Sequence, residues 1–472
     1  MSPPSGRTAK RRRILTDARG AVNYWWTLFG AGLLSLTAGL GTARAAGLPT
    51  TGELRVLVVL AGFPDRPLAH DRSHFAGNPD ALVDRLVAYY SEVSSGRLTL
   101  VPHLGGPVVT LPEPRARYVQ RPSSLAHDAI TAFAAAATAP DDLAALTSAR
   151  AVIVFFAGTG RESHLTPGDP SDPWSNFTVV LPPAGGFSDA CIIAEDEREE
   201  LSSFGVLCHE FGHQLGLPEL YAPGGRPQEG IGVWGLMGQG TWLGHGNLPP
   251  HMDAWSKARL GWIDVEVIDR TTRRVELPAV EEVPRAIKIP AVPGRPQEYY
   301  LLENRAQVGA DAKLPGEGLL IWHVDERVMS FRDAQNDPAH KLLHLVEADG
   351  RGDLDRGHAA GGNRGDATDP WRGPPRWRRG AVAAGALLGA LMLALAILAG
   401  RGPGALGRVL PRLLLGGVLL ALAAWLHEAP VCGPATPGMA PYGGEPGRVV
   451  IRNVSPAGRR MWVDVLVAPA PE

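Results

Sequence analysis

The chain of 472 residues contains little cysteine and has no excess of either charge. Its three cysteines, Cys191, Cys208 and Cys432, are too few and too widely spaced for a disulfide framework or for a zinc site made of thiolates alone. Lys and Arg number 46 against 48 Asp and Glu, so the formal net charge is −2. Without a basic excess, electrostatic capture of nucleic acid is not expected.

The sequence also lacks a Gly-X-Y period, which excludes a collagen-like chain, and it shows no internal repeat. Hydrophobic residues make up 45% and charged residues 20%, a composition typical of packed domains and not of a wholly disordered chain. Gly and Pro number 57 and 42, which predicts many turns and long loops. The length is sufficient for two or three domains.

Basic residues precede an apolar segment near the N-terminus. The apolar segment covers residues 21–40 and is followed by Ala43-Arg44-Ala45, which fits a small-x-small cleavage site. The segment is longer than most signal-peptide cores, so an uncleaved anchor is an alternative to cleavage. We therefore interpret residues 1–46 as a signal peptide or N-terminal membrane anchor. The following domain is expected to be exported, either extracellular or at the cell surface.

Short apolar runs predict an α/β domain followed by a β-rich domain. Residues 54–60 and 151–156 are typical of buried strands, and helical patterns lie near residues 79–93 and 124–137. We assign residues 47–264 to this α/β domain. A β-rich domain over residues 265–370 is indicated by strand patterns at residues 274–277, 286–289, 298–303 and 318–324.

Two long apolar segments lie within residues 371–430. The first, residues 380–400, contains 21 uncharged residues, about 31 Å as a helix, which matches a bilayer core of roughly 30 Å. The second, residues 409–426, is weaker because it contains Pro411 and Arg412. We predict a transmembrane hairpin and hence a lipid bilayer as partner. Strand-like segments within residues 431–472 are expected to complete the β-rich domain.

The strongest local signal is the sequence HEFGH at residues 209–213, an H-E-x-x-H motif inside a helical pattern over residues 201–217. His209 and His213 are four residues apart, so both imidazoles can reach one ion. The apolar residues of this segment form a stripe on the nearly opposite face: Phe204, Leu207, Phe211 and Leu215. Chance accounts poorly for the motif in this context, and we predict a metal site.

A tetrahedral catalytic zinc takes three protein ligands and leaves one position for water. Glu219, ten residues after His209, is the candidate third ligand, because Gly216 permits the turn that returns the chain to the metal. Glu210 is expected beside the open position, where it would act as general base. Met237 lies in a Gly-flanked turn 24 residues after His213. It is expected to form the floor of the site or, alternatively, to fill an ordinary loop core.

Three segments together resemble the immune inhibitor A family of secreted bacterial zinc metalloproteases: HEFGHQLGLPELY, GVWGLMGQGTW and PPHMDAWSKARLGW. Further similarity covers LRVLVVLAGFPD, YYSEVSSGRLTL, YYLLENR, LPGEGLLIWHVDE, GDATDPW and RVVIRNVS. The resemblance implies an α+β fold with a zincin- or metzincin-like catalytic domain. It also implies zinc on His209, His213 and Glu219, with Glu210 as base and Met237 in a Met-turn. The family often has Asp where this chain has the longer Glu219.

A Gly-rich loop gathers five acidic residues: Asp349, Asp353, Asp355, Asp366 and Asp369. Hard oxygen ligands on a flexible loop suit Ca²⁺, although the spacing is not that of an EF-hand. Even with the resemblance to a calcium-containing family, a plain solvated acidic loop is the favoured interpretation, and a Ca²⁺ site is the alternative. His323, with Asp325 and Glu303, is better explained by alternation on strands than by a second metal site.

The two cysteines near the motif are expected to be structural. Cys208 precedes His209 but projects about 100° away around the helix, so a buried thiol is the simpler interpretation. A bond between Cys191 and Cys208 is possible in an oxidising compartment, and the sequence does not decide it.

The expected function is an exported zinc-dependent endopeptidase that hydrolyses peptide bonds in protein or peptide substrates. The alternative is a membrane-anchored processing or scaffolding module with the same fold but restricted or no proteolytic activity. A catalytically silent scaffold is less favoured because loss of function usually removes the base, and Glu210 is present.

Overall fold

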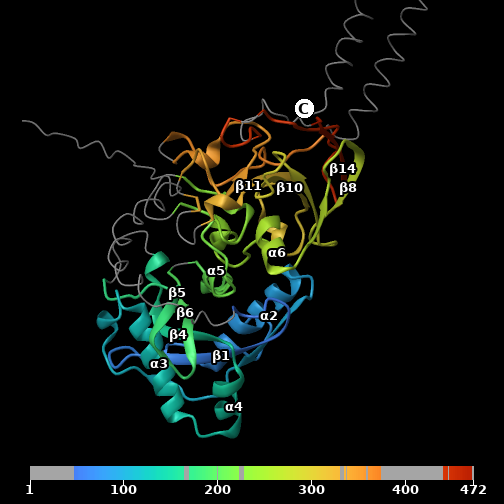
Figure 1. Cartoon of the computed structure of the whole chain (residues 1–472). Helices are drawn as coiled ribbons and strands as arrows, with labels where there is room; N and C mark the ends of the chain where they lie inside the picture. Colours follow the sequence, from blue (N-terminus) through green and yellow to red (C-terminus); the bar gives the residue numbers. More distant parts are fainter. Residues whose placement is uncertain are drawn as a thin grey trace, which may run out of the picture.

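The computed structural model describes residues 47–163, 170–198, 200–222, 228–329, 334–335, 337–357, 360–373, 439–444 and 446–469. An α/β half and a β-rich half lie one on the other, with helix α5 (Ser203–Gln214) near their junction (Figure 1). In the described part of the chain, no helix is both long and apolar enough to span a bilayer. The segments predicted to be membrane-embedded or cleaved, residues 1–46, 380–400 and 409–426, lie outside the described residues.

The α/β half is built on a mostly parallel sheet in the order β2-β1-β4-β6-β5, with β3 also paired to β1. Its strands are β1 (Gly52–Gly62), β2 (Leu98–His103), β3 (Val108–Thr110), β4 (Ala151–Thr159), β5 (Asn176–Ala184) and β6 (Phe187–Asp196). Only β5 runs antiparallel to its neighbour, β6. The predicted strands near residues 54–60 and 151–156 are confirmed as β1 and β4. Strands β5 and β6 were not predicted.

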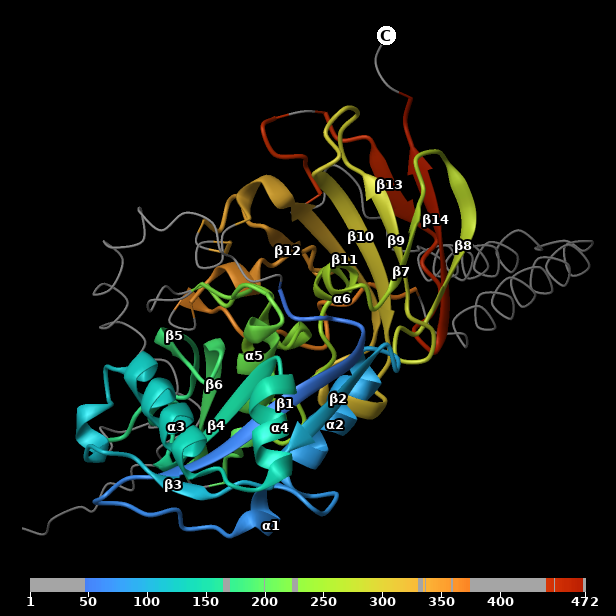
Figure 2. The same cartoon turned by 60° about the horizontal axis from the view of Figure 1, so that its bottom comes forward.

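Helices cover both faces of this sheet, as Figure 2 shows. The helices are α1 (Arg72–Phe75), α2 (Leu82–Val93), α3 (Pro122–Ala136) and α4 (Pro140–Ser148), together with α5. Val56 and Val58 of β1 pack in one hydrophobic cluster with residues of α2 and α5. Leu57 and Val59 point to the other face and pack with residues of α3. The predicted helices near residues 79–93 and 124–137 are confirmed as α2 and α3.

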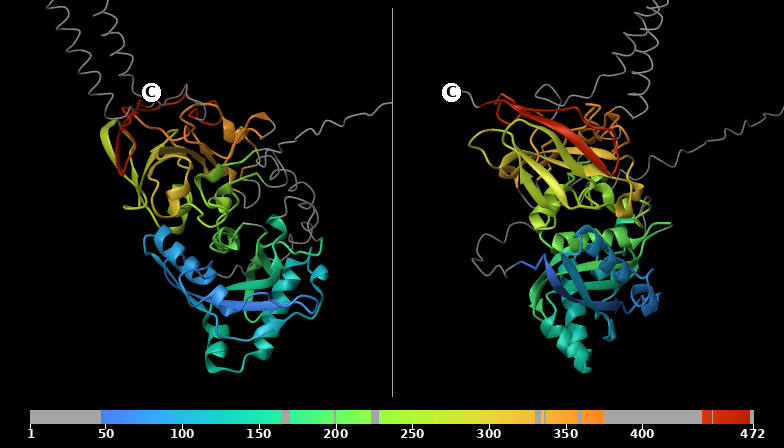
Figure 3. Two further views of the ribbon diagram at one scale, coloured as in Figure 1. Left: turned by 180° about the vertical axis from the view of Figure 1, so that it is seen from behind. Right: turned by 90° about the vertical axis from the view of Figure 1, so that its right-hand side faces the viewer.

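The β-rich half contains two sheets, with strand orders β12-β11-β10-β9-β7 and β13-β14-β8. It begins after α6 (Ala254–Leu260). Its strands are β7 (Asp264–Val267), β8 (Thr272–Pro278), β9 (Arg285–Pro290), β10 (Glu298–Arg305), β11 (Gly318–Asp325), β12 (Leu343–Leu345), β13 (Val449–Arg452) and β14 (Arg460–Val467). The C-terminal β14 lies against β8, with Val463 paired to Val275 (Figure 3).

Strands β10 and β11 are buried on both faces. Leu301 and Trp322 belong to the hydrophobic cluster that also contains residues of α2 and α5. Leu302 and Ile321 belong to the cluster between the two sheets of the β-rich half. The five-stranded sheet therefore shares a hydrophobic core with helix α5, and the two halves pack against each other.

Short 3₁₀ helices complete the described elements: η1 (Arg115–Arg117), η2 (Arg161–Ser163), η3 (Gly232–Trp234), η4 (Gln239–Trp242), η5 (Gly309–Lys313), η6 (Glu326–Val328) and η7 (Asp353–Asp355). Together with the sheets and helices they form a mixed α/β fold, in agreement with the predicted class.

Candidate metal centre

Helix α5 carries the H-E-x-x-H motif and has a defined beginning and end. The Ser202 side chain caps its start by accepting a hydrogen bond from the Phe204 amide at 3.2 Å. At its end Gly216 has φ of +96°, and the Leu217 amide donates to the Gly212 carbonyl at 3.2 Å. This is the Schellman arrangement, which requires a residue that tolerates positive φ. The helix therefore stops just after His213, and the chain turns back toward the two histidines.

Backbone carbonyls fix the orientation of both imidazoles. His209 Nδ1 lies 3.0 Å from the Leu236 carbonyl oxygen, and His213 Nδ1 lies 2.9 Å from that of Leu217. A carbonyl oxygen can only accept, so each Nδ1 carries a proton, and each Nε2 is directed at Glu219. Thr241 Oγ1 lies 3.1 Å from His209 Nδ1 and adds a second polar neighbour. Both rings are thus oriented with Nε2 toward the position of an ion before any ion binds.

Glu219 closes the site. Its Oε1 lies 3.2 Å from His213 Nε2, and its Oε2 lies 3.3 Å from His209 Nε2. Ligands at tetrahedral positions about 2.0–2.1 Å from zinc are about 3.3 Å apart. The two distances between histidine and carboxylate agree with this spacing, and the three residues offer ligand atoms that all lie within 4.8 Å of one another.

The charge of Glu219 also suits a ligand. Burial alone would raise its pKa, but attraction to His213 and His209 holds the pKa well below the usual range. The Tyr221 hydroxyl donates to Glu219 Oε1 at 3.1 Å. Glu219 Oε2 is buried and has no hydrogen-bond partner, as expected for an oxygen that binds a cation.

Glu210 is not one of the three donors, and a separate hydrogen bond holds its carboxylate. Its Oε2 accepts a hydrogen bond from the Phe177 amide of β5 at 2.6 Å. Burial raises the pKa of Glu210, partly offset by His209 and His213. A carboxylate with a raised pKa accepts a proton more readily at neutral pH.

The turn around Met237 supports both metal-binding segments. The Leu236 carbonyl orients His209, and the Met237 carbonyl accepts the Leu220 amide at 2.9 Å, next to Glu219. The wholly buried Met237 side chain packs under α5 at Gly212. The structure thus places Met237 beneath the two histidines, where the sequence had left an ordinary loop core as the alternative.

Part of the acidic loop gathers at a second candidate ion site. Carboxylate oxygens of Asp349, Asp353 and Asp366 form one group, and those of Glu347, Asp349 and Asp369 form another, each within 4.8 Å. Asp369 is fully buried, and its Oδ1 has no hydrogen-bond partner.

Asp355, which the sequence placed with these ligands, instead forms an ion pair with Lys341. Glu347 was not predicted because it precedes Asp349 in the sequence, outside the Gly-rich segment. The structure therefore removes one residue from the predicted set and adds another.

Among the described residues, His70, His74 and Asp196 also offer ligand atoms within 4.8 Å of one another, but all three are only half-buried. The rings of His70 and His74 stack with centroids 4.0 Å apart, and His70 Nε2 lies 2.7 Å from Asp196. His323 contacts Glu298 at 3.2 Å, while Asp325 bonds to the side chain of Arg327. The strand interpretation of His323 and Asp325 agrees with these contacts.

Cys191 and Cys208 are free and buried. The Cys191 thiol lies 3.4 Å from Gln214 Oε1, whereas Cys208 contributes its backbone carbonyl to the Tyr90 hydroxyl at 2.8 Å. Cys432 lies outside the described residues. Neither of the described thiols joins the three metal donors.

Sequence reasoning missed the residues that hold the ligands in place. Tyr221 and Thr241 contact ligands through side chains, while Phe177 contacts Glu210 through its amide. A tyrosine two residues after Glu219 was the available signal for Tyr221. No local pattern pointed to Phe177, because its strand was not predicted.

Residues 189–263 match the family model described as immune inhibitor A peptidase M6, catalytic domain. The matched segment contains α5, Glu219 and Met237. The resemblance predicted from the sequence is therefore confirmed over this segment, which is that of a peptidase. No curated protein matches the chain.

Proposed function

We propose that the chain, whose residues 189–263 match a peptidase catalytic domain, is a zinc-dependent endopeptidase acting on proteins or peptides. The observation that carries the proposal is the approach of His209 Nε2 and His213 Nε2 to the two oxygens of Glu219, at 3.3 and 3.2 Å. Two imidazoles and one carboxylate leave a fourth tetrahedral position for water, as in catalytic zinc sites.

The residues of the chain divide the chemistry between them. Zinc bound at His209, His213 and Glu219 would lower the pKa of a bound water and polarise the scissile carbonyl. Glu210 would accept a proton from the attacking water and deliver it to the leaving amine. The Phe177 amide holds the Glu210 carboxylate in place, so the base is oriented before the substrate arrives.

The test compares zinc content and casein digestion in four proteins. Wild type is expected to bind one zinc and to digest casein. His213→Ala and Glu219→Ala lose zinc because each removes a coordinate bond. Glu210→Gln keeps zinc but loses activity, because only the proton acceptor is removed. Full activity in Glu210→Gln would contradict the mechanism. A zinc content equal to that of wild type in Glu219→Ala would exclude Glu219 as a ligand.

The proposal includes a Ca²⁺ ion on the acidic loop. Glu347, Asp349, Asp353, Asp366 and Asp369 offer hard oxygen donors, which Ca²⁺ prefers. Burial raises the pKa of Glu347 to about 7 and of Asp369 to about 6. Both carboxylates are therefore costly to ionise without a counter-charge, and the unpartnered Oδ1 of Asp369 supports the same interpretation.

The proposal also places the activity outside the cytoplasm, on a chain anchored in the bilayer. Its support is the apolar composition of residues 21–40, 380–400 and 409–426. Because β14 pairs with β8, residues 460–467 lie on the same side as the β-rich half, which supports an even number of crossings, as in a hairpin. On intact cells, external protease should reach both the catalytic half and a tag after Val467. Protection of the tag alone would contradict the hairpin.

A further inference from the structure

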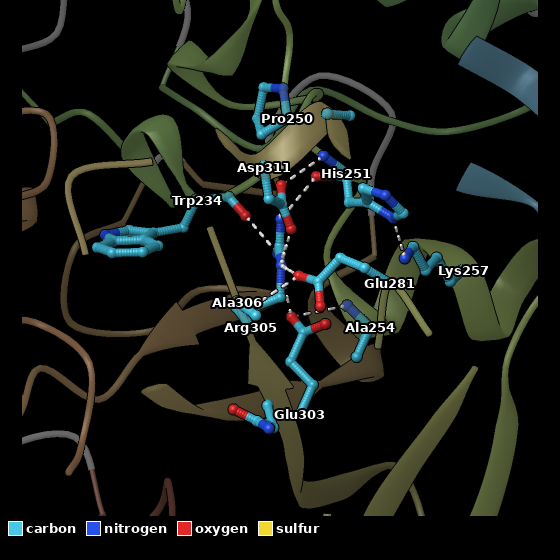
Figure 4. A network of polar contacts seen from close by, with 12 residues as sticks. Trp234, Pro250, His251, Ala254, Lys257, Glu281, Glu303, Arg305, Ala306 and Asp311 are labelled. Atoms are coloured by element: carbon cyan, nitrogen blue, oxygen red, sulfur yellow. Dashed lines mark hydrogen bonds and ion pairs between the residues drawn. The ribbon is translucent and has the colours of Figure 1, made fainter. Parts of the chain in front are cut away.

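Arg305, the last residue of β10, is a fully buried cation beside the turn that supports the metal centre. Its Nε and Nη2 donate to the two oxygens of Asp311 at 2.7 and 2.6 Å. Its Nη1 donates to the Trp234 carbonyl oxygen at 3.0 Å, and its Nη2 also reaches the His251 carbonyl at 3.3 Å. Figure 4 shows the guanidinium between these groups.

The charge of Arg305 is balanced inside the protein. Asp311 and Glu303 supply the negative charge, with Glu303 3.5 Å from the guanidinium, and the carboxyl of Glu281 lies at the same distance. The Asp311 contact is bidentate, the strongest arrangement for an arginine and a carboxylate. Asp311 therefore anchors one edge of the guanidinium, and Nη1 remains directed at Trp234.

The Trp234 carbonyl begins the turn that contacts both metal-binding segments. Two residues later the Leu236 carbonyl orients His209, and three residues later the Met237 carbonyl binds the Leu220 amide. The Trp234 indole is held from the other side, because its Nε1 donates to Asp369 Oδ2 at 2.9 Å. A shift at Trp234 would thus move the supports of His209 and of the segment carrying Glu219.

We propose that Arg305 is a positioning residue for the metal centre: it fixes the turn from Trp234 to Met237, and through that turn it orients His209 and Glu219. The inference rests on the proposed function, since it concerns the geometry of the same three ligands. It assigns a role in metal binding to a strand of the β-rich half, outside residues 189–263.

Arginine is suited to this position for a geometric reason. Its planar fork bonds two partners at fixed angles, whereas a lysine ammonium acts as one point charge. Arg305→Lys keeps the positive charge among Glu303 and Asp311 but cannot reproduce the fork that joins Asp311 to Trp234. The variant therefore separates the positioning role from charge balance.

The first measurement is zinc affinity by chelator competition. Arg305→Lys should bind zinc at least about tenfold more weakly, the usual effect of losing a group that orients a ligand. Asp311→Asn, which keeps Arg305 but weakens its anchor, should shift zinc affinity in the same direction. This second variant decides the question if Arg305→Lys does not fold.

Two control variants separate positioning from general stability. Ile451→Ala leaves a cavity in the core between the two sheets, away from Trp234, and should lower the melting temperature with unchanged zinc affinity. Glu281→Gln should leave zinc affinity unchanged as well. Burial raises the pKa of Glu281, so its carboxyl is already neutral at neutral pH.

The second measurement is hydrogen exchange on the metal-free proteins. Arg305→Lys should speed exchange of the Leu220 amide, which bonds to Met237, more than Ile451→Ala does. Equal effects of Arg305→Lys and Ile451→Ala on both exchange and zinc affinity would overturn the inference. If wild type takes up no zinc, the proposed function fails, and the exchange result alone decides the role of Arg305.

Discussion

Met237 Sδ packs against Gly212, in the helical turn between His209 and His213. A Cβ atom added to Gly212 would lie 2.6 Å from that sulfur, closer than such atoms approach in proteins. Gly212 is helical, so the need for glycine here comes from close packing and not from an unusual φ angle. The thioether therefore fixes the distance between the motif helix and the turn that supports it.

Gly212→Ala should push the turn away from α5. We expect a stability loss of about 1–3 kcal/mol, as for overpacking in other cores, together with weaker zinc binding. Denaturant unfolding and chelator competition measure the two effects. In a Met237→Ala background the clash is absent, so the cost of Gly212→Ala should be smaller. Equal costs in both backgrounds would show that the two residues do not act through this contact.

Tyr221→Phe should weaken zinc binding by about tenfold, because it removes the hydrogen bond to the ligand oxygen of Glu219. Tyr90→Phe is the matched control. It removes a hydroxyl that bonds to the Cys208 carbonyl of the same helix, without touching a ligand. Its expected result is a stability loss of about 1 kcal/mol with unchanged zinc affinity. Equal zinc affinities in the two variants would contradict a role for Tyr221 in holding Glu219.

Addition of Ca²⁺ should raise the melting temperature of the zinc-loaded protein. An ion at one hundred times its dissociation constant stabilises the folded state by about 2.7 kcal/mol. Asp369→Asn should reduce this response because Asp369 belongs to the candidate site. Asp355→Asn should keep it, because Asp355 pairs with Lys341 instead. If Ca²⁺ does not change the melting temperature of wild type, the Ca²⁺ site is contradicted and the segment is a solvated acidic loop.

Asp253 should make stability depend on pH between about 4 and 6. Burial raises its pKa from 3.8 to about 6, although its oxygens accept hydrogen bonds from Ser256. An acid with a raised folded pKa contributes stability that is present below its unfolded pKa and is lost as pH rises through the folded one. A tenfold change in an acid's ionisation constant corresponds to about 1.4 kcal/mol, so the stability lost is on the order of 3 kcal/mol.

Asp253→Asn has no proton to lose and keeps an oxygen that can cap α6 at the Ser256 amide. Denaturant unfolding at several pH values should therefore show a flatter profile for the variant between pH 4 and 6. Parallel profiles for wild type and Asp253→Asn would assign the pH dependence to other groups.

The local parts of the site can be predicted from short stretches of sequence. Spacing of four residues places His209 and His213 on one side of a helix, and Gly216 ends that helix by adopting positive φ. Alternation along β1 likewise determines that Val56 and Leu57 enter different cores. These features depend on residues within one or two turns of each other, so periodicity and single-residue preferences are sufficient to predict them.

The surroundings of those residues depend on contacts between distant segments. The proton on His209 Nδ1 is directed by a carbonyl 27 positions away, and Arg305 reaches Trp234 across 71 positions. Asp355 lies outside the grouped carboxylates and pairs with Lys341, 14 positions away. Periodicity indicates which face of an element is buried, but it carries no information about which distant segment covers that face. Those contacts depend on how whole helices and sheets pack, and they orient the candidate metal ligands.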